Sequence, residues 1–503
     1  MPKRKQNGTK ARELEGKSPP ETKKKKESNG KSHGQSDEVS SLDFLSPENF
    51  FTSFISPCSA TEFMEQYWEK EPLHLSNRNA LISAGDIFSR EILENLVETR
   101  NIEFVRDICT SCYKNGERKN LDGHGRIKRA QLKKLMEKQN ATIQLHQPQR
   151  FQESLWRMME LLETKFGCLF GANVYITPGG HQGLAPHHDD VEVFILQLEG
   201  QKQWHLYKPL QELPRTYSKD LSIDEIGNPT HSLVLKPGDL LYFPRGVIHQ
   251  ALAVDKFSHS THITFSTYQH HTFSDYLLSG LPKMLGSAYD SDISFRRGLP
   301  VGFLSGSKLD MTTSSTLKDL LYNLSKRIVP TQEQVFQDMK LSFIANRLPP
   351  YQAQEAVQEM NIRPEGSSIT HMRLKYPGHT CVVVAGPPNQ TIFCETKHNE
   401  EEDEDAESDE EDSDDDDEES EDGYNGNQKE DVFHVYNSIS NNRRIHMMVQ
   451  AETKPVAHVF PMRLLETFRR LEEAAGEWVS VKNLNVEDDE MLLGELVECK
   501  YCT

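Results

Sequence analysis

The stretch NVYITPGGHQGLAPHHDDVEVFILQLEGQKQWHLY, residues 173–207, alternates short runs of Val, Ile, Phe, Tyr and Thr with turns. These residue types are enriched in strands, whereas Gly, Pro and Asp favour turns. The same texture continues through LVLKPGDLLYFPRGVIHQA (233–251) and STHITFSTY (260–268). Many short strands separated by turn residues predict an all-β barrel or jelly roll at about 171–270.

The quoted stretch contains His-x-Asp in two overlapping registers, His187 with Asp189 and His188 with Asp190. Alternate residues of a strand point to the same face, so either pair can present an imidazole beside a carboxylate. With 20 histidines and 77 acidic residues in the chain, a bare pair arises easily by chance. Spacing alone leaves both registers open, and a metal site needs a further ligand.

A candidate for that ligand ends the segment GDLLYFPRGVIH, residues 238–249, which has the form G-x5-P-x-G-x2-H. This pattern predicts a turn, a buried strand and a second turn, followed by a strand that delivers His249. Two imidazoles and one carboxylate leave three positions open on an octahedral metal. Such a set is typical of non-haem Fe(II) oxygenases.

The segment 238–249 resembles the second motif of the cupin superfamily, and together with 173–207 it resembles the Jumonji-C ribosomal oxygenases. YWEKEPLHL (67–75), ATIQLHQPQRF (141–151) and ANRLPPY (345–351) are also similar to that family, so the resemblance covers most of the chain. It implies an α+β protein built on a double-stranded β-helix, the cupin or JmjC jelly roll. The oxygenase domain is expected at 42–280.

The family pattern reads Pro-His-x-Asp, and Pro186 fixes its position in this sequence. The resemblance therefore implies His187, Asp189 and His249 as the metal ligands. His188 then falls at a variable position and Asp190 outside the ligand set. The resemblance further implies Fe(II) as the metal, with 2-oxoglutarate and dioxygen as cosubstrates.

Lys202 shares the parity of Trp204 and Leu206, which places it inward if those apolar residues face the barrel. A buried ammonium requires an anion, and a dicarboxylate supplies one. The resemblance implies that Lys202 binds 2-oxoglutarate; Lys208, at the end of the same strand, is the alternative. Thr264 is a second candidate contact of the cosubstrate.

Three polar strand residues are candidates for the substrate pocket. Asn173 and Tyr175 alternate to one face of their strand, and Ser266 shares the parity of Thr264. Taken alone they are ordinary polar strand residues. The resemblance implies that they line the substrate pocket.

The resemblance implies an enzyme, a 2-oxoglutarate-dependent dioxygenase that hydroxylates a histidine of a basic large-subunit ribosomal protein in ribosome biogenesis. The alternative within the same class is a chromatin regulator that demethylates a methyl-lysine of the histone H3 tail and affects rRNA transcription. A hypothesis of another class is a non-catalytic nucleolar scaffold. A complete ligand triad with an inward lysine speaks against the scaffold, which needs none of these residues.

The flanks of the barrel carry helical signals. Before it, Ser46–Pro47 and the pair Ser59/Glu62 have helix-capping spacing, and 149–166 carries an apolar stripe. After it, 315–328 and 331–348 have apolar residues at spacings of three and four. The family has a helical dimerisation region here, so we expect one at 281–348 and a homodimer.

The last part of the chain, 349–503, contains FPMRLLETFRRLEEAAGEW (460–478) and VEDDEMLLGELVE (486–498), which suit a winged-helix-like domain. Its helices are net acidic, and a phosphate backbone repels acidic surfaces. We therefore expect a protein-binding or structural role without direct DNA binding.

Two segments carry most of the charge. Residues 1–31 hold 11 Lys and Arg against 4 Glu, whereas 400–422 hold 19 acidic residues and no basic ones. Such composition predicts a disordered basic tail at 1–41 and a disordered acidic insert at 399–423. Basic clusters are typical of nuclear import signals, so we expect the nucleus and nucleolus. No apolar run has the length of a membrane span, and no membrane partner is expected.

Eight cysteines in 503 residues are few, and a disulfide framework is not expected in an intracellular protein. The C-x-x-C pairs Cys109/Cys112 and Cys499/Cys502 have zinc-ligand spacing. Their wide separation in sequence disfavours a common zinc site.

Overall fold

The computed structural model describes residues 41–76, 78, 87–305, 311–351, 370–384, 431–448 and 456–484. The chain divides into Met1–Val39 and a compact unit, Ser40–Thr503, which contains every described residue. The predictions for the basic tail, except for Ser41, and for the acidic insert lie outside the described residues.

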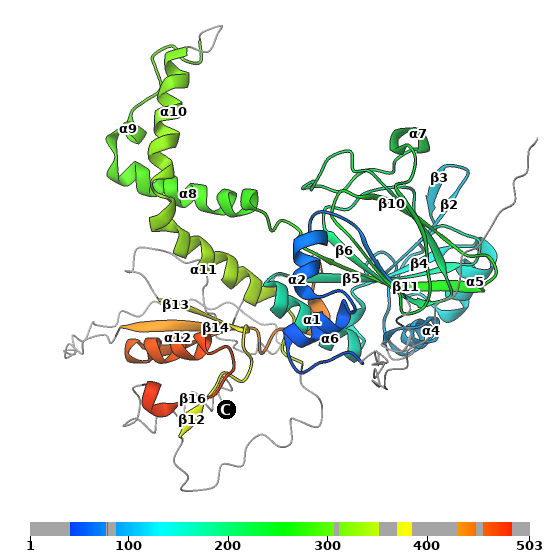
Figure 1. Cartoon of the computed structure of the whole chain (residues 1–503). Coiled ribbons are helices and arrows are strands. Elements are labelled where there is room, and N and C mark those ends of the chain that lie inside the picture. Colours follow the sequence, from blue (N-terminus) through cyan, green and yellow to red (C-terminus); the bar gives the residue numbers. More distant parts are fainter. Residues whose placement is uncertain are drawn as a thin grey trace, which may run out of the picture. The chain divides into compact units, whose positions relative to one another are not determined.

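Two antiparallel sheets form the centre of the unit (Figure 1). The larger has eight strands in the order β1 (Leu73–Leu75), β9 (Leu240–Phe243), β6 (Glu192–Glu199), β11 (His259–Thr267), β5 (Phe170–Pro178), β4 (Thr142–His146), β2 (Ile108–Lys114) and β3 (Glu117–Asn120). The smaller has the order β10 (Ile248–Ala253), β7 (Lys202–Tyr207) and β8 (His231–Leu235). The predicted strands at 171–270 are present.

Strand β6 shows how the sheets are packed, because nearly all of its residues are buried. Val193 and Ile195 contact Trp204 of β7 in the core between the two sheets. Phe194 and Leu196 belong to a second core on the opposite side of the larger sheet. A strand buried on both faces reads as a continuous apolar run, which explains VEVFILQL in the sequence.

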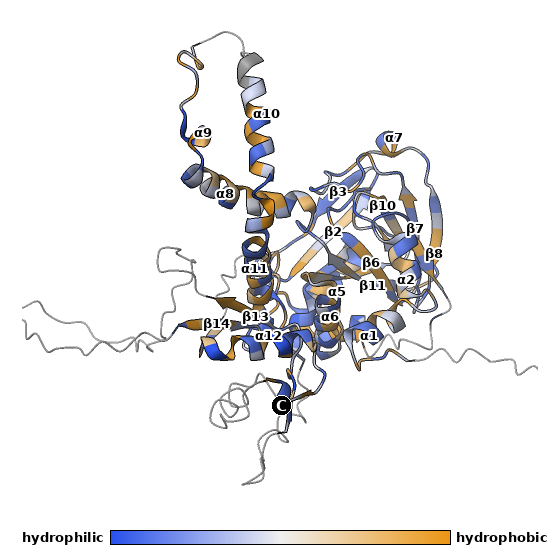
Figure 2. Ribbon diagram, turned by 60° about the vertical axis from the view of Figure 1, so that its left-hand side comes forward, coloured by the Kyte–Doolittle hydropathy of each residue, from blue (hydrophilic) through white to orange (hydrophobic). Residues whose placement is uncertain are grey.

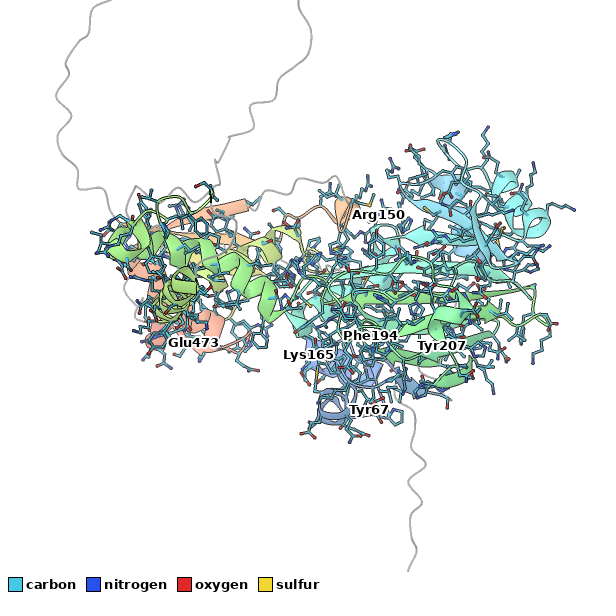
Figure 3. The ribbon with its side chains drawn as sticks, turned by 90° about the horizontal axis from the view of Figure 1, so that it is seen from above. Tyr67, Arg150, Lys165, Phe194, Tyr207 and Glu473 are labelled. Atoms are coloured by element: carbon cyan, nitrogen blue, oxygen red, sulfur yellow. The ribbon has the colours of Figure 1, made fainter. Side chains whose placement is uncertain are left out.

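Helices cover that second face. They are α1 (Pro47–Phe54), α2 (Ala60–Glu62), the π-helix η1 (Phe63–Tyr67), α4 (Arg90–Thr99), α5 (Arg129–Gln139), the 3-10 helix η2 (Pro148–Arg150) and α6 (Glu153–Phe166). Ser46 and Ser59 cap α1 and α2 through their side chains, as predicted. Phe194 lies among packed side chains (Figure 3), with ring centroids of Phe63 and Tyr242 at 5.8 and 5.0 Å.

The N-terminal flank is not helical only, because strands β1–β4 extend the larger sheet beyond the predicted barrel. β3 consists of the exposed residues ERKN and β1 of three residues. Neither has an apolar alternation long enough to be recognised, and each forms through pairing with a neighbouring strand.

Helices follow the barrel: α8 (Phe273–Ser291), α9 (Ile293–Arg296), α10 (Met311–Ser325) and α11 (Ile328–Asn346). The boundary predicted at 280/281 falls inside α8. Apolar and polar segments alternate along these helices (Figure 2), and several large apolar side chains are exposed: Phe273, Leu278, Tyr289, Ile293, Leu321, Tyr322 and Val329.

The C-terminal residues form a small sheet of β13 (Thr380–Val384), β14 (Val432–Asn437) and β15 (Val456–Pro461), and α12 (Leu465–Glu473) shares its core. β12 (His371–Met372) pairs with β16 (Val479–Ser480), and three 3-10 helices complete this part: η3 (Arg443–Ile445), η4 (Met462–Leu464) and η5 (Val481–Leu484). A further short helix, α7 (Ile223–Ile226), lies between β7 and β8. The winged-helix-like domain stays a prediction, since 486–498 lie outside the described residues.

Buried polar contacts tie α6 to this C-terminal part. His379 lies 2.8 Å from Glu160 through Nε2, and His446 lies 2.8 Å from Glu163 in the same way. The backbone N–H of Leu348 also donates to Glu163, at 2.8 Å. Both carboxylates are buried, so these partners replace the water that they lose on folding.

Among the described helices, none combines the length and the apolar character that a membrane crossing requires.

Candidate metal centre and substrate pocket

His187, Asp189 and His249 come together at one end of the barrel interior. One ligand atom from each lies within 4.8 Å of the other two. The Asp189 carboxylate is 3.8 Å from Nε2 of His187 and 3.7 Å from Nε2 of His249. Within the described part of the chain, no other group of three His, Cys, Asp or Glu residues is arranged in this way.

Backbone pairing positions the three side chains. His187 and His249 exchange hydrogen bonds, at 3.2 Å from His187 N to His249 O and 2.9 Å in the reverse direction. Gly246 donates its N–H to the carbonyl of Asp189 at 3.0 Å. Gly246 has φ +88°, and a Cβ there would stand 2.8 Å from the carbonyl oxygen of Gln211. Only glycine fits this turn without strain, which explains the glycine before His249.

Both imidazoles are held with Nε2 toward the Asp189 carboxylate. Nδ1 of His187 donates to the carbonyl of Ala185 at 2.8 Å, and Nδ1 of His249 donates to that of Val247 at 3.1 Å. A backbone acceptor at Nδ1 leaves the Nε2 lone pair available for a metal. Burial, and then the nearby His187, lower the pKa of His249 to about 4. The neutral imidazole that binds metals is therefore the resting form.

The donor set fits a divalent transition metal with open positions. The cluster offers two imidazole nitrogens and one carboxylate, which is the ligand set of the facial triad in non-haem Fe(II) oxygenases. The ligand assignment itself stays a prediction.

The second register of the His-x-Asp motif is used differently. His188 donates its backbone N–H to the Ser218 hydroxyl at 2.9 Å and is not part of the cluster. Asp190 accepts a hydrogen bond from the Gln269 side chain at 3.1 Å. The geometry thus brings together the residues that the family pattern selects.

Lys202 lies in a cavity that the three ligand residues also line. Its side chain is buried, and Nζ donates to the Thr177 hydroxyl at 3.2 Å. Among the described residues no carboxylate forms a salt bridge with it, and burial lowers the pKa of Lys202 to about 7. Trp204, in the same cavity, has a buried indole Nε1 that no described residue accepts from. The cavity thus offers hydrogen-bond donors that can bind an anion.

The turn before β7 directs Lys202 inward. Gly200 has φ +61°, and a Cβ at this position would meet the carbonyl oxygen of His259 at 2.1 Å. Only glycine at position 200 therefore lets the turn pass this close to β11. Lys208, the alternative, is exposed at the end of β7.

The predicted substrate residues line a larger groove that adjoins the cavity. Asn173, Tyr175, Thr264 and Ser266 all contribute to it, and Thr264 and Tyr175 also line the cavity. Thr264 pairs directly with Asn173 in the β11–β5 register. Burial raises the pKa of the Tyr175 hydroxyl, which accepts a hydrogen bond from Gln144 at 3.1 Å.

Two residues that contact Lys202 were not found from the sequence: His262, which lines the cavity, and Thr177. His262 stacks on Tyr175, with ring centroids 5.0 Å apart, and its Nδ1 lies 3.5 Å from Lys202 Nζ. The signal was available, because His262 shares the parity of Thr264 and Ser266. Thr177, the partner of Lys202, has the parity of Asn173 and Tyr175.

The cysteines of the first C-x-x-C pair, Cys109 and Cys112, are free thiols on β2. Cys499 and Cys502 lie outside the described residues, so a joint zinc site stays untested.

Comparison with known proteins agrees with this site. A family model described as the JmjC domain matches residues 144–275. Ribosomal oxygenase 2 of Rattus norvegicus is 36% identical over 458 residues, which cover 90% of this chain and 90% of that protein. A Drosophila persimilis protein named bifunctional lysine-specific demethylase and histidyl-hydroxylase NO66 is 34% identical over 306 residues, 59% of this chain and 44% of its own.

Among solved structures, the ribosomal oxygenase YcfD of Escherichia coli covers 88% of this chain and 98% of its own, with 15% identity and a TM-score of 0.44. A likeness of this degree carries no argument about function. The identity of 36% along 90% of both chains shows that this protein belongs to the ribosomal oxygenase family of JmjC-domain, 2-oxoglutarate-dependent dioxygenases.

Proposed function

We propose that this enzyme uses Fe(II), 2-oxoglutarate and dioxygen to hydroxylate a histidine of a large-subunit ribosomal protein. The observation that carries the proposal is one cavity lined both by the His187–Asp189–His249 cluster and by the buried cation Lys202. The names of the relatives, ribosomal oxygenase and histidyl-hydroxylase, support the substrate class.

Each part of the site has a task in this reaction. His187, Asp189 and His249 would hold the metal, which supplies the redox chemistry between dioxygen and the keto acid. Lys202 binds the far carboxylate of 2-oxoglutarate by a charge-assisted hydrogen bond, and the hydroxyl of its neighbour Thr177 donates a second hydrogen bond. The two atoms of dioxygen are divided: one enters the succinate that forms as the keto acid loses CO₂, and the other enters a C–H bond of the substrate as a hydroxyl group.

The walls of the cavity serve the same chemistry. Val193, Ile195 and Trp204 line it between the two sheets and keep water away from the metal position. Asn173, Tyr175 and Ser266 lie on the groove side and hold the substrate imidazole by hydrogen bonds. A fixed substrate brings one C–H bond to the metal, and the resulting proximity accounts for selectivity.

Mass spectrometry tests the proposal. The protein is incubated with Fe(II), 2-oxoglutarate and large-subunit ribosomal proteins, and we expect a gain of one oxygen on a histidine. Loss of a methyl group from a lysine of a histone H3 peptide, without histidine oxidation, would support the demethylase instead. Succinate formation no greater than that of His187→Ala would leave only a binding scaffold.

We also propose a homodimer formed through α8–α11. The exposed apolar side chains of these helices, Leu321, Tyr322 and Val329 among them, suit an interface with a second copy. Sedimentation equilibrium should give twice the chain mass for the wild type and the chain mass for a Leu321→Asp, Tyr322→Asp variant. Asp319→Asn on the same helix is the control, and a double variant that remains dimeric would contradict this interface.

The nucleus and nucleolus are the proposed location, because ribosomal proteins are assembled there and residues 1–31 are strongly basic. A fluorescent fusion without these residues should be excluded from the nucleus. Unchanged nucleolar fluorescence would contradict the import role of the tail.

A further inference from the structure

Three side chains from neighbouring strands form a hydrogen-bonded line that ends at the substrate groove. Cys109 lies on β2, His146 on β4 and Asn173 on β5, and these strands are adjacent in the larger sheet. The Cys109 Sγ is 3.3 Å from Nε2 of His146, and the His146 Nδ1 is 3.0 Å from Oδ1 of Asn173. His146 and Asn173 are direct cross-strand partners. Asn173 lines the groove.

The direction of these hydrogen bonds follows from their chemistry. The Oδ1 of Asn173 only accepts, so Nδ1 of His146 must carry the hydrogen. A neutral imidazole then has its lone pair on Nε2, which accepts from the Cys109 thiol. Burial lowers the pKa of His146 and raises the pKa of the Cys109 thiol, so both groups stay uncharged.

The hydrogen bond from His146 engages only the oxygen of the Asn173 amide, so its NH₂ group remains available to the groove. No described residue accepts a hydrogen bond from this NH₂ group. The groove side of the pocket therefore presents an N–H donor. Without His146 the amide could rotate by half a turn and present its oxygen, because the two ends are nearly equal in size.

The backbone around His146 makes this arrangement rigid. His146 donates its N–H to the carbonyl of Asp107 at 2.8 Å, and its own carbonyl accepts from Arg150 at 3.1 Å. Arg150 and Asp107 form a buried ion pair at 2.8 Å. His146 is thus held through its backbone N–H and carbonyl as well as through its imidazole ring.

A thiol, an imidazole and an amide in this order also occur in cysteine hydrolases, where the thiolate attacks a carbonyl. Here burial, followed by Asp122, raises the pKa of Cys109, which disfavours a thiolate. The geometry therefore gives Cys109 the part of a hydrogen-bond donor at the end of the line.

We infer that Cys109 and His146 are positioning residues that fix the Asn173 amide with its NH₂ group toward the substrate. This inference rests on the proposed function and adds a reason for its substrate class. A neutral imidazole accepts a hydrogen bond through its unprotonated nitrogen, whereas a methylated ammonium has no acceptor. The line therefore favours a histidine over a methyl-lysine.

Steady-state kinetics with a histidine peptide tests the role of His146. His146→Leu should raise the KM for the peptide about five- to tenfold, the value of one neutral hydrogen bond. The kcat and the KM for 2-oxoglutarate should change less. In His146→Asn the side-chain nitrogen can take the place of Nδ1, so this variant should recover most of the lost affinity. His205→Leu, on the outer side of β7 where Nδ1 contacts Ser232, is the matched control.

Cys109 is tested in the same assay. Cys109→Ser keeps an O–H donor and should behave as the wild type, whereas Cys109→Ala should raise the peptide KM about twofold. Equal defects in His146→Leu and His146→Asn would show a packing role and overturn the inference. So would a wild-type peptide KM in His146→Leu.

The two proposals fail in different ways. If the wild type neither binds the histidine peptide nor oxidises it, the proposed function fails, and the positioning role fails with it. If the wild type hydroxylates histidine and His146→Leu binds the peptide equally well by fluorescence anisotropy, only the positioning inference is overturned.

Discussion

The barrel and the helices that follow it use their apolar residues in opposite ways. β6 buries apolar side chains on both faces, toward the metal cavity and toward the N-terminal helices. Along α8–α11 apolar positions recur (Figure 2), and many of the large apolar side chains are exposed. A region that buries its own apolar side chains can hold a precise site, whereas exposed apolar surface suits the interface that we propose with a second copy.

The largest effect is expected at the metal ligands, where the self-sufficient barrel should tolerate loss of a side chain. His187→Ala or His249→Ala should abolish iron binding and turnover while the far-ultraviolet circular dichroism stays that of the wild type. His188→Ala is the control and should keep its iron. If His188→Ala lost iron and His187→Ala retained it, the other register would hold the metal.

The packing contrast can be tested with two phenylalanines. Phe194 is 1% exposed and Phe273 is 91% exposed. Phe194→Ala should lower the free energy of unfolding by about 3–5 kcal/mol, because it leaves a cavity in the core. In the dissociated monomer, Phe273→Ala should change it by less than about 0.5 kcal/mol.

Denaturant titration at several protein concentrations measures both. A large cost for Phe273→Ala that disappears on dilution would show that a partner covers this residue in solution. A small cost for Phe194→Ala would contradict the tight packing of the barrel.

The next largest effect is expected at Lys202, which forms the charged end of the cavity. Lys202→Ala should raise the KM for 2-oxoglutarate by about 30- to 150-fold, since a charge-assisted hydrogen bond contributes about 2–3 kcal/mol. Lys208→Ala, at the exposed end of the same strand, should leave this KM unchanged. The reverse pattern would reassign the cosubstrate site to Lys208.

The smallest effect is expected from the acidic residues 400–422, which belong to neither region. Ribosomal proteins are basic, so 19 acidic residues should speed their encounter with the enzyme. Deletion of 400–422 should lower kcat/KM for a basic protein several-fold and leave kcat unchanged. Salt should diminish the loss, because the Debye length is roughly 10 Å at 0.1 M. An unchanged kcat/KM at low salt would refute steering.

The local features of this architecture could be predicted from the sequence, whereas contacts between residues far apart in the chain could not. Strand parity placed Lys202 inward, and capping residues located α1 and α2, because both signals lie within a few residues. His146 was not recognised as a partner of Asn173, since their contact depends on the β4–β5 register across 27 positions of chain. Strand β3 was missed because its four residues are all polar and exposed.

The polar contacts of α6 limit how this protein can be divided into working fragments. Glu160 and Glu163 take their histidine partners from positions 219 and 283 residues further along the chain. A fragment that ended after the barrel would retain every candidate ligand and cosubstrate residue, yet both carboxylates would lose these partners. Leaving a buried polar group without its hydrogen-bond partner costs about 1–3 kcal/mol. We therefore expect a stable catalytic fragment to need the chain through His446, far beyond the last residue of the site.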